Sequence, residues 1–131
     1  MNLKYLGASL LCGGAWGLIA LAMGHAVVPE RELWTGVLSS PLIGLLVGVV
    51  SSPAYSFPLA ARMFLPPFFL YFSALLFAMA MSLRGDFNVD LQENLGGVMY
   101  GTTIYLPMLL PLAYLTHFGL GRLRSRPAKP D

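Results

Sequence analysis

The sequence is poor in charged residues. Only 11% of its 131 residues are Asp, Glu, Lys or Arg, whereas 56% are hydrophobic and the mean hydropathy is +0.69. Soluble domains carry roughly a quarter charged residues, so the composition excludes an ordinary soluble domain and predicts an integral membrane protein. The formal net charge of +2 is too small to indicate nucleic-acid binding.

Cysteine and histidine are also scarce, which excludes most metal and redox sites. Cys12 is the only cysteine, so the chain can form neither an internal disulfide nor a paired-cysteine site. The only histidines, His25 and His117, are expected at opposite membrane faces, roughly 30 Å apart, and cannot share one haem. Residues 86–97 begin like a calcium-binding loop but lack the glycine and glutamate that such a loop needs. We therefore predict no metal and no cofactor.

The hydrophobic residues are gathered in four runs, each close to the length of a transmembrane helix. The runs cover residues 5–28, 33–52, 65–83 and 95–118. They predict an all-α integral membrane protein: a four-helix transmembrane domain with short loops over residues 1–121, then a basic flexible tail over residues 122–131. The core of each run lacks Asp, Glu, Lys and Arg, which argues against a proton relay or ion-coupled transport.

The distribution of basic residues predicts the orientation. With the N-terminus inside, the cytoplasmic Lys and Arg residues are Lys4, Arg62, Arg122, Arg124, Arg126 and Lys129. Only Arg31 and Arg84 fall outside, and this bias predicts cytoplasmic N- and C-termini. We predict a multi-pass protein of the plasma membrane, with a bacterial inner membrane as the expected location. A cleaved signal peptide is the alternative for the first run, but such signals have shorter apolar stretches.

Prolines occur at the start of one run and inside two others. Pro66 and Pro67 fall in the first turn of the third predicted helix, where their missing N–H groups cost no hydrogen bond. The prolines inside runs are Pro41, Pro107 and Pro111. We expect kinked but continuous helices, with Ser39 or Ser40 beside Pro41, and Thr103 before Pro107, supporting the breaks. A discontinuous helix at a binding site is the alternative.

Small residues recur at intervals of four and indicate faces where helices pack closely. The predicted packing positions are Gly13 and Gly17 in the first run, Gly36, Ser40, Gly44 and Gly48 in the second, and Gly97 and Gly101 in the fourth. The pattern predicts tight helix association, either within one chain or between copies.

The fourth run is the most polar. Tyr100, Thr103, Tyr114 and His117 fall on one face if the helix is continuous. This face is a possible polar path, or a surface for a quinone-sized or lipid-headgroup-sized ligand. The simpler interpretation is that the tyrosines and histidine anchor the helix at the two membrane interfaces.

The sequence shows neither a nucleophile–base pair nor a metal cluster, so we predict no catalytic residues and no enzyme. We expect a small accessory or structural subunit that packs against other membrane helices in a larger complex. Its partners would be the lipid bilayer, other membrane subunits or copies of itself. The alternative is a small oligomeric permease or channel that uses the polar face of the fourth helix.

Overall fold

A computed structural model describes residues 2–25, 30–83 and 87–124, and over these residues the structure is helical without strands. The long helices are α1 (Leu3–Gly24), α2 (Glu30–Ser51), α4 (Leu65–Ser82), α5 (Phe87–Ile104) and α6 (Leu106–Leu123). Two short helices, η1 (Ser52–Ser56) and α3 (Leu59–Arg62), connect α2 to α4. Most of the predicted tail, residues 125–131, lies outside the described residues.

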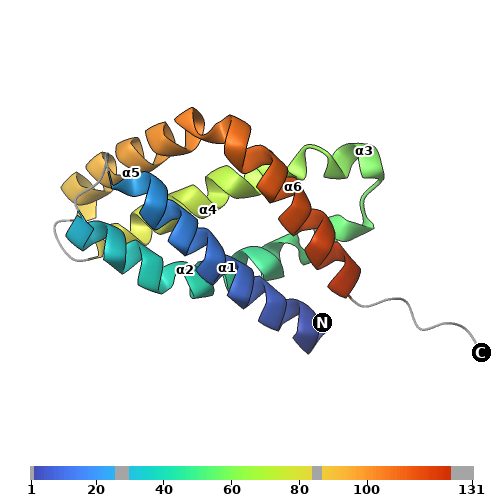
Figure 1. Cartoon of the computed structure of the whole chain (residues 1–131). Coiled ribbons are helices and arrows are strands. Elements are labelled where there is room, and N and C mark those ends of the chain that lie inside the picture. Colours follow the sequence, from blue (N-terminus) through green and yellow to red (C-terminus); the bar gives the residue numbers. More distant parts are fainter. Residues whose placement is uncertain (1, 26–29, 84–86, 125–131) are drawn as a thin grey trace, which may run out of the picture.

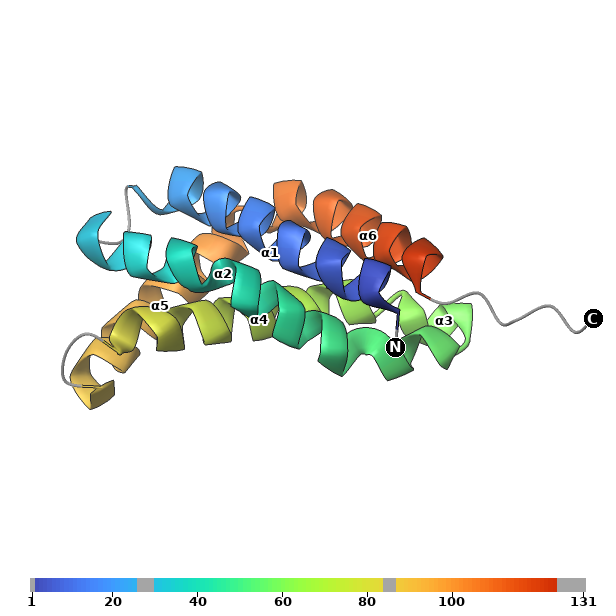
Figure 2. The ribbon, with the colours of Figure 1, turned by 90° about the horizontal axis from the view of Figure 1, so that it is seen from below.

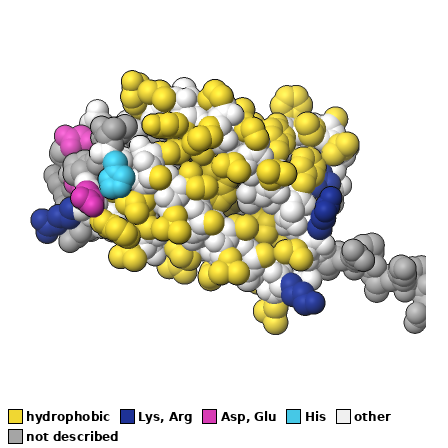
Figure 3. Space-filling model, viewed as in Figure 1, with side chains coloured by type: hydrophobic (Ala, Val, Ile, Leu, Met, Phe, Trp, Pro, Cys, Tyr) yellow, Lys and Arg dark blue, Asp and Glu magenta, His cyan; other side chains and the backbone are white. Residues whose placement is uncertain are grey.

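Helices α1, α2 and α4 each run between the two ends of the molecule, whereas α5 and α6 run from opposite ends to a bend (Figures 1 and 2). The N-terminus, α3 and the end of α6 lie at one end of the molecule, and the start of α2 lies at the other. Hydrophobic side chains cover the middle, while charged side chains gather at the two ends (Figure 3). The segments Leu3–Gly24, Glu30–Ser56 and Leu59–Ser82 are long and apolar enough to cross a membrane, as predicted for the first three runs.

The tandem proline begins a helix. Helix α4 starts at Leu65, so Pro66 and Pro67 lie in its first turn. Their missing N–H groups fall where a helix has no internal acceptor for them. This prediction is confirmed, and α4 continues without interruption to Ser82.

The prediction of one continuous helix over residues 95–118 is wrong. The segments Leu91–Ile104 and Leu106–Leu123 meet at Tyr105 with a bend of 86°. Helix α5 also begins at Phe87, so the segment between the third and fourth predicted runs is helical from that residue onward. The two helices form an arch whose apex points away from α1 and α2 (Figure 1). Taken as one span, this bent pair would give the molecule a fourth membrane crossing.

Proline chemistry explains the break. Pro107 has no N–H to donate to the Thr103 carbonyl, so the helix cannot continue normally across Tyr105. The N–H groups of Met108 and Leu109 both donate to the Tyr105 carbonyl, at 3.0 and 2.9 Å, and start α6 in a new direction. Pro107 therefore lies in the first turn of α6 and not inside a continuous helix.

Pro41 has a different effect, because α2 continues through it. The carbonyl that Pro41 leaves free belongs to Val37, four residues earlier. The Ser40 hydroxyl donates to this carbonyl at 2.6 Å. The prediction that a neighbouring serine supports the helix at Pro41 is confirmed for Ser40, whereas Ser39 bonds the Thr35 carbonyl.

Helices α1 and α2 share the most extensive contact in the molecule, along their small residues. A methyl group added at Gly13 would lie 2.7 Å from the Gly44 Cα, and one added at Gly44 would overlap the Gly13 backbone. A methyl group added at Gly17 would overlap Ser40, and one added at Gly48 would overlap Ser9 of α1. The two backbones are therefore in direct contact, as small-residue faces allow.

The other small residues have different surroundings. Gly36 faces the ring of Phe77 on α4, and Phe77 forms a buried cluster with Leu33, Val37 and Met81. A methyl group added at Gly101 would meet no atom within 4 Å, so this glycine makes no close helix contact. Gly97 and Gly101 both line the cavity described below.

Candidate functional site

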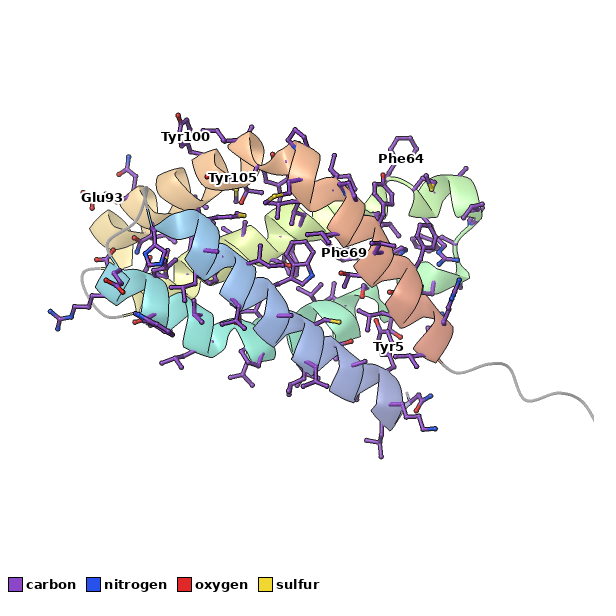
Figure 4. All side chains as sticks on the ribbon, in the orientation of Figure 1. Tyr5, Phe64, Phe69, Glu93, Tyr100 and Tyr105 are labelled. Carbon is purple, nitrogen blue, oxygen red and sulfur yellow. The ribbon has the colours of Figure 1, made fainter. Side chains whose placement is uncertain are left out.

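A cavity of about 190 Å³ lies between the α5–α6 arch and helices α1, α2 and α4. Most of its lining is apolar, and Phe69 of α4 lies beneath the arch (Figure 4). An engineered apolar cavity of about 150 Å³ in another protein stays dry and binds benzene. This cavity therefore has room for one ring or a short alkyl segment.

The bend at Tyr105 and the small residues on both arms of the arch keep the cavity open. Gly97 and Gly101 of α5 line it, as does Ala113 of α6. A methyl group added at Gly101 would meet no atom within 4 Å, so the cavity wall is open at this residue although α5 packs on α4. Trp16 connects the arch to α1 through a hydrogen bond of 3.2 Å from its indole nitrogen Nε1 to the Thr116 hydroxyl.

The cavity has a polar end where His117 and Tyr55 contribute to its lining. The two rings stack with centroids 4.7 Å apart and planes inclined by 14°. The Tyr55 hydroxyl donates to the His117 carbonyl at 2.9 Å, which holds η1 against α6. His117 is 6% exposed, and its Nε2 atom is buried without a hydrogen-bond partner among the described residues.

Two arginines lie close to the Tyr55 ring. The Arg62 Cζ lies 5.3 Å from the ring centroids of both Tyr55 and Phe118, and the Arg124 Cζ lies 5.9 Å from that of Tyr55. We call Tyr55, Arg62, His117, Phe118 and Arg124 the basic aromatic cluster. Each arginine is within the distance of a cation–π interaction.

No carboxylate neutralises the cluster within the part of the chain that the structure describes. The Arg62 Nε is buried and has no hydrogen-bond partner there. The described carboxylates belong to α2 and α5 and lie at the opposite end of the molecule, where Figure 4 labels Glu93. The cluster therefore carries two formal positive charges from Arg62 and Arg124 next to an apolar cavity.

The bend divides the predicted polar face of the fourth run. Tyr100 is 62% exposed on α5, while Thr103 donates to the Met99 carbonyl and bonds the Tyr71 hydroxyl at 3.0 Å. On α6, the Tyr114 hydroxyl donates to the Met63 carbonyl just before α4, and His117 is buried. The prediction of one continuous polar face is wrong, and the Thr103 hydroxyl does not support the break at Pro107.

Sequence reasoning missed the role of Tyr55 and the pairing of Trp16 with Thr116. Neither is visible in a local pattern, because the partners lie 62 and 100 residues apart in the chain. It also missed Asn94, which is 4% exposed and donates to the Ser82 hydroxyl at 3.3 Å. An amide at the edge of an apolar run is a signal for such a buried contact, although it names no partner.

Comparison of the chain with protein families, curated proteins and solved structures finds no match. Within the described ranges, no three His, Cys, Asp or Glu side chains come together as metal ligands. The cavity combines an apolar body with a hydrogen-bonding, positively charged end. Such an arrangement can hold a molecule that has an apolar part and a polar head.

Proposed function

We propose that this is a non-catalytic integral membrane protein that binds a small amphiphilic molecule beneath the α5–α6 arch. The observation that carries the proposal is the cavity of about 190 Å³, which is apolar inside and ends at His117. A ligand of matching size gains dispersion contacts with the apolar side chains that line the cavity. Broken helices form the binding sites of several membrane transporters, which supports a binding site at the bend between α5 and α6.

We further propose that the protein spans the plasma membrane, in a bacterium the inner membrane, with both termini in the cytoplasm. The ends of α1, α3 and α6 bring Lys4, Arg62, Arg122 and Arg124 to one end of the molecule (Figures 1 and 3). Concentration of Lys and Arg on one side supports a cytoplasmic location for that end. A reporter fused after Lys129 should read cytoplasmic, and one fused at Asn88 should read extracytoplasmic. The opposite result would reverse the proposed orientation.

The packing of α1 and α2 weakens the case for an accessory subunit. The glycine-rich faces of these helices, which predicted close association, contact one another within a single chain. They are therefore not free to bind other membrane helices. A permease for the bound molecule, acting alone or as an oligomer, is the second candidate function, because the break lies in a segment that can serve as a span.

The binding proposal can be tested by photolabelling with a diazirine-bearing hexadecanol in lipid vesicles that contain the protein. Wild type should be labelled at residues that line the cavity. Gly101→Leu should lose most of this labelling, because its side chain projects into open space at the cavity wall. Gly96→Leu is the matched control, since Gly96 lies on the same helix, also has open space around it and is outside the cavity lining.

Labelling that avoids the cavity, or that Gly101→Leu leaves unchanged, would contradict the binding proposal. Mass spectrometry after gentle detergent extraction distinguishes this role from that of an accessory subunit. A stoichiometric set of other membrane subunits would favour the accessory role, and a homogeneous preparation with a bound amphiphile would favour the role proposed here.

A further inference from the structure

We propose that the amphiphile carries an acidic head group, a phosphate or a carboxylate, and that the basic aromatic cluster binds it. This inference rests on the proposed function, because the segment of the apolar chain next to the head group would lie in the cavity. Arg62 is the cation that binds the head group, and His117 Nε2 supplies a hydrogen bond.

The first argument concerns uncompensated charge. Arg62 and Arg124 lie about Tyr55, and within the described residues no carboxylate approaches either guanidinium. The contacts with Tyr55 and Phe118 stabilise the cations only in part, and the buried Arg62 Nε keeps a free donor. A guanidinium that is partly removed from water gains most from an anion with two oxygen atoms, which can accept two parallel hydrogen bonds.

The second argument is independent of the arginines and concerns His117. A buried polar atom without a partner is costly, and nearly all buried polar groups in folded proteins have one. His117 Nε2 is such an atom, in a side chain that is 6% exposed. The stacked Tyr55 ring, whose hydroxyl also bonds the His117 carbonyl, fixes the imidazole in place. With its proton on Nε2, the imidazole donates a hydrogen bond to an anionic oxygen.

The position of the two groups favours a lipid-like acid over a free anion. His117 and Tyr55 belong both to the cluster and to the wall of the apolar cavity. One molecule can therefore place its head group among the basic side chains and its chain among the apolar ones. The cluster also lies toward the end of the molecule where α3 and the end of α6 meet, beside the hydrophobic middle (Figures 1 and 3). In a bilayer, lipid head groups lie at the two edges of the hydrophobic core.

The test compares two photoactivatable probes that differ only in the head group: a diazirine-bearing hexadecyl phosphate and the matching hexadecanol. Both are added to vesicles of zwitterionic phosphatidylcholine that contain the full-length protein, and the labelling of cavity residues is measured. Wild type should prefer the phosphate. Arg62→Gln should lower this preference roughly tenfold, the effect of one charge-assisted hydrogen bond. His117→Phe, which keeps a ring against Tyr55 but removes Nε2, should lower it several-fold.

Arg122→Gln is the control for general attraction between the basic end and an anion. Arg122 is exposed at the end of α6 and takes no part in the cluster, so its removal should leave the preference nearly unchanged. If Arg62→Gln fails to fold, as judged by its thermal unfolding, Arg124→Gln replaces it with the same expected direction.

Three outcomes would overturn the inference. Equal labelling of wild-type cavity residues by both probes would support a site for an amphiphile but contradict its preference for an acidic head group. An equal fall in preference for Arg62→Gln and Arg122→Gln would indicate surface attraction without a site. Loss of the preference when inorganic phosphate is present at the same concentration as the probe would show that the cluster binds free phosphate as readily as a lipid phosphate, so that the apolar chain adds nothing to binding. Absence of cavity labelling by either probe would instead contradict the proposed function itself.

Discussion

The contact between α1 and α2 predicts that a single added methyl group destabilises the protein. Gly44→Ala places a Cβ against the Gly13 backbone and against the carbonyl of Ser9, one turn earlier on α1. A flexible side chain could rotate away from this overlap, but a backbone cannot. The two helices must therefore separate along the face where they now touch.

Two opposing effects set the size of the change. Overpacking costs about 1–3 kcal/mol, and alanine favours a helix over glycine by about 1 kcal/mol. Because the overlap is with backbone atoms, we expect the upper half of the overpacking range and a net loss of about 1–2 kcal/mol. For a chain of this length, this corresponds to an unfolding midpoint lower by roughly 3–10 °C.

The assay is thermal unfolding of the purified protein in a mild detergent, with Gly7→Ala as the control. Gly7 is exposed on α1, and a methyl group added there meets no atom within 4 Å. The same chemical change should therefore stabilise the protein by up to about 1 kcal/mol through helix propensity alone. The double variant Gly13→Ala/Gly44→Ala should lose less than the sum of its single changes, because the first methyl group already separates the helices.

The direction in which each of the two substitutions, Gly44→Ala and Gly7→Ala, shifts the unfolding midpoint tests the contact between α1 and α2. If Gly44→Ala raises the midpoint as much as Gly7→Ala does, α1 and α2 do not meet backbone to backbone. The arrangement of the whole bundle would then need revision, since this contact is its most extensive one.

Further predictions concern single polar contacts. Ser40→Ala should cost about 1 kcal/mol of unfolding free energy but cost much less in a Pro41→Ala background, where the new N–H replaces the hydroxyl as donor; equal losses in both backgrounds would refute this. Trp16→Phe and Thr116→Val should each loosen α6, seen as faster proteolysis of its end, and the double variant should be no worse than either single one. Asn94→Ala should speed hydrogen exchange at the start of α5 and lower stability by about 1 kcal/mol; unchanged exchange would show that the hydrogen bond does not hold α5 to α4.

The sequence alone predicted helices that are long and apolar enough to cross a membrane, and it predicted most of the helices observed. Apolar runs of about 20 residues without charge can only be satisfied in a bilayer as helices, because every backbone polar group must bond internally. Local rules also sufficed for the start of α4 at its tandem proline and for the support of Pro41 by Ser40. In each case the interacting groups lie within one turn of helix.

The direction of the chain after Tyr105 was decided by tertiary structure. Pro41 and Pro107 remove the same backbone hydrogen bond, yet α2 continues through the first while the second begins a new helix at 86°. At Pro41 a serine hydroxyl replaces the donor, and close contact with α1 supports the helix on that face. At Pro107 the Thr103 hydroxyl bonds elsewhere and space remains beneath the arch.

The candidate site likewise exists only in three dimensions. Tyr55, Arg62 and His117 come from η1, α3 and α6, and none of them stands in a motif. Their meeting depends on the return of α6 to the end where α2 and α4 are joined. The uneven distribution of Lys and Arg among the loops predicted that this end is basic. The contact between Tyr55 and His117, 62 residues apart, depends on packing, because no local periodicity encodes a contact between separate helices.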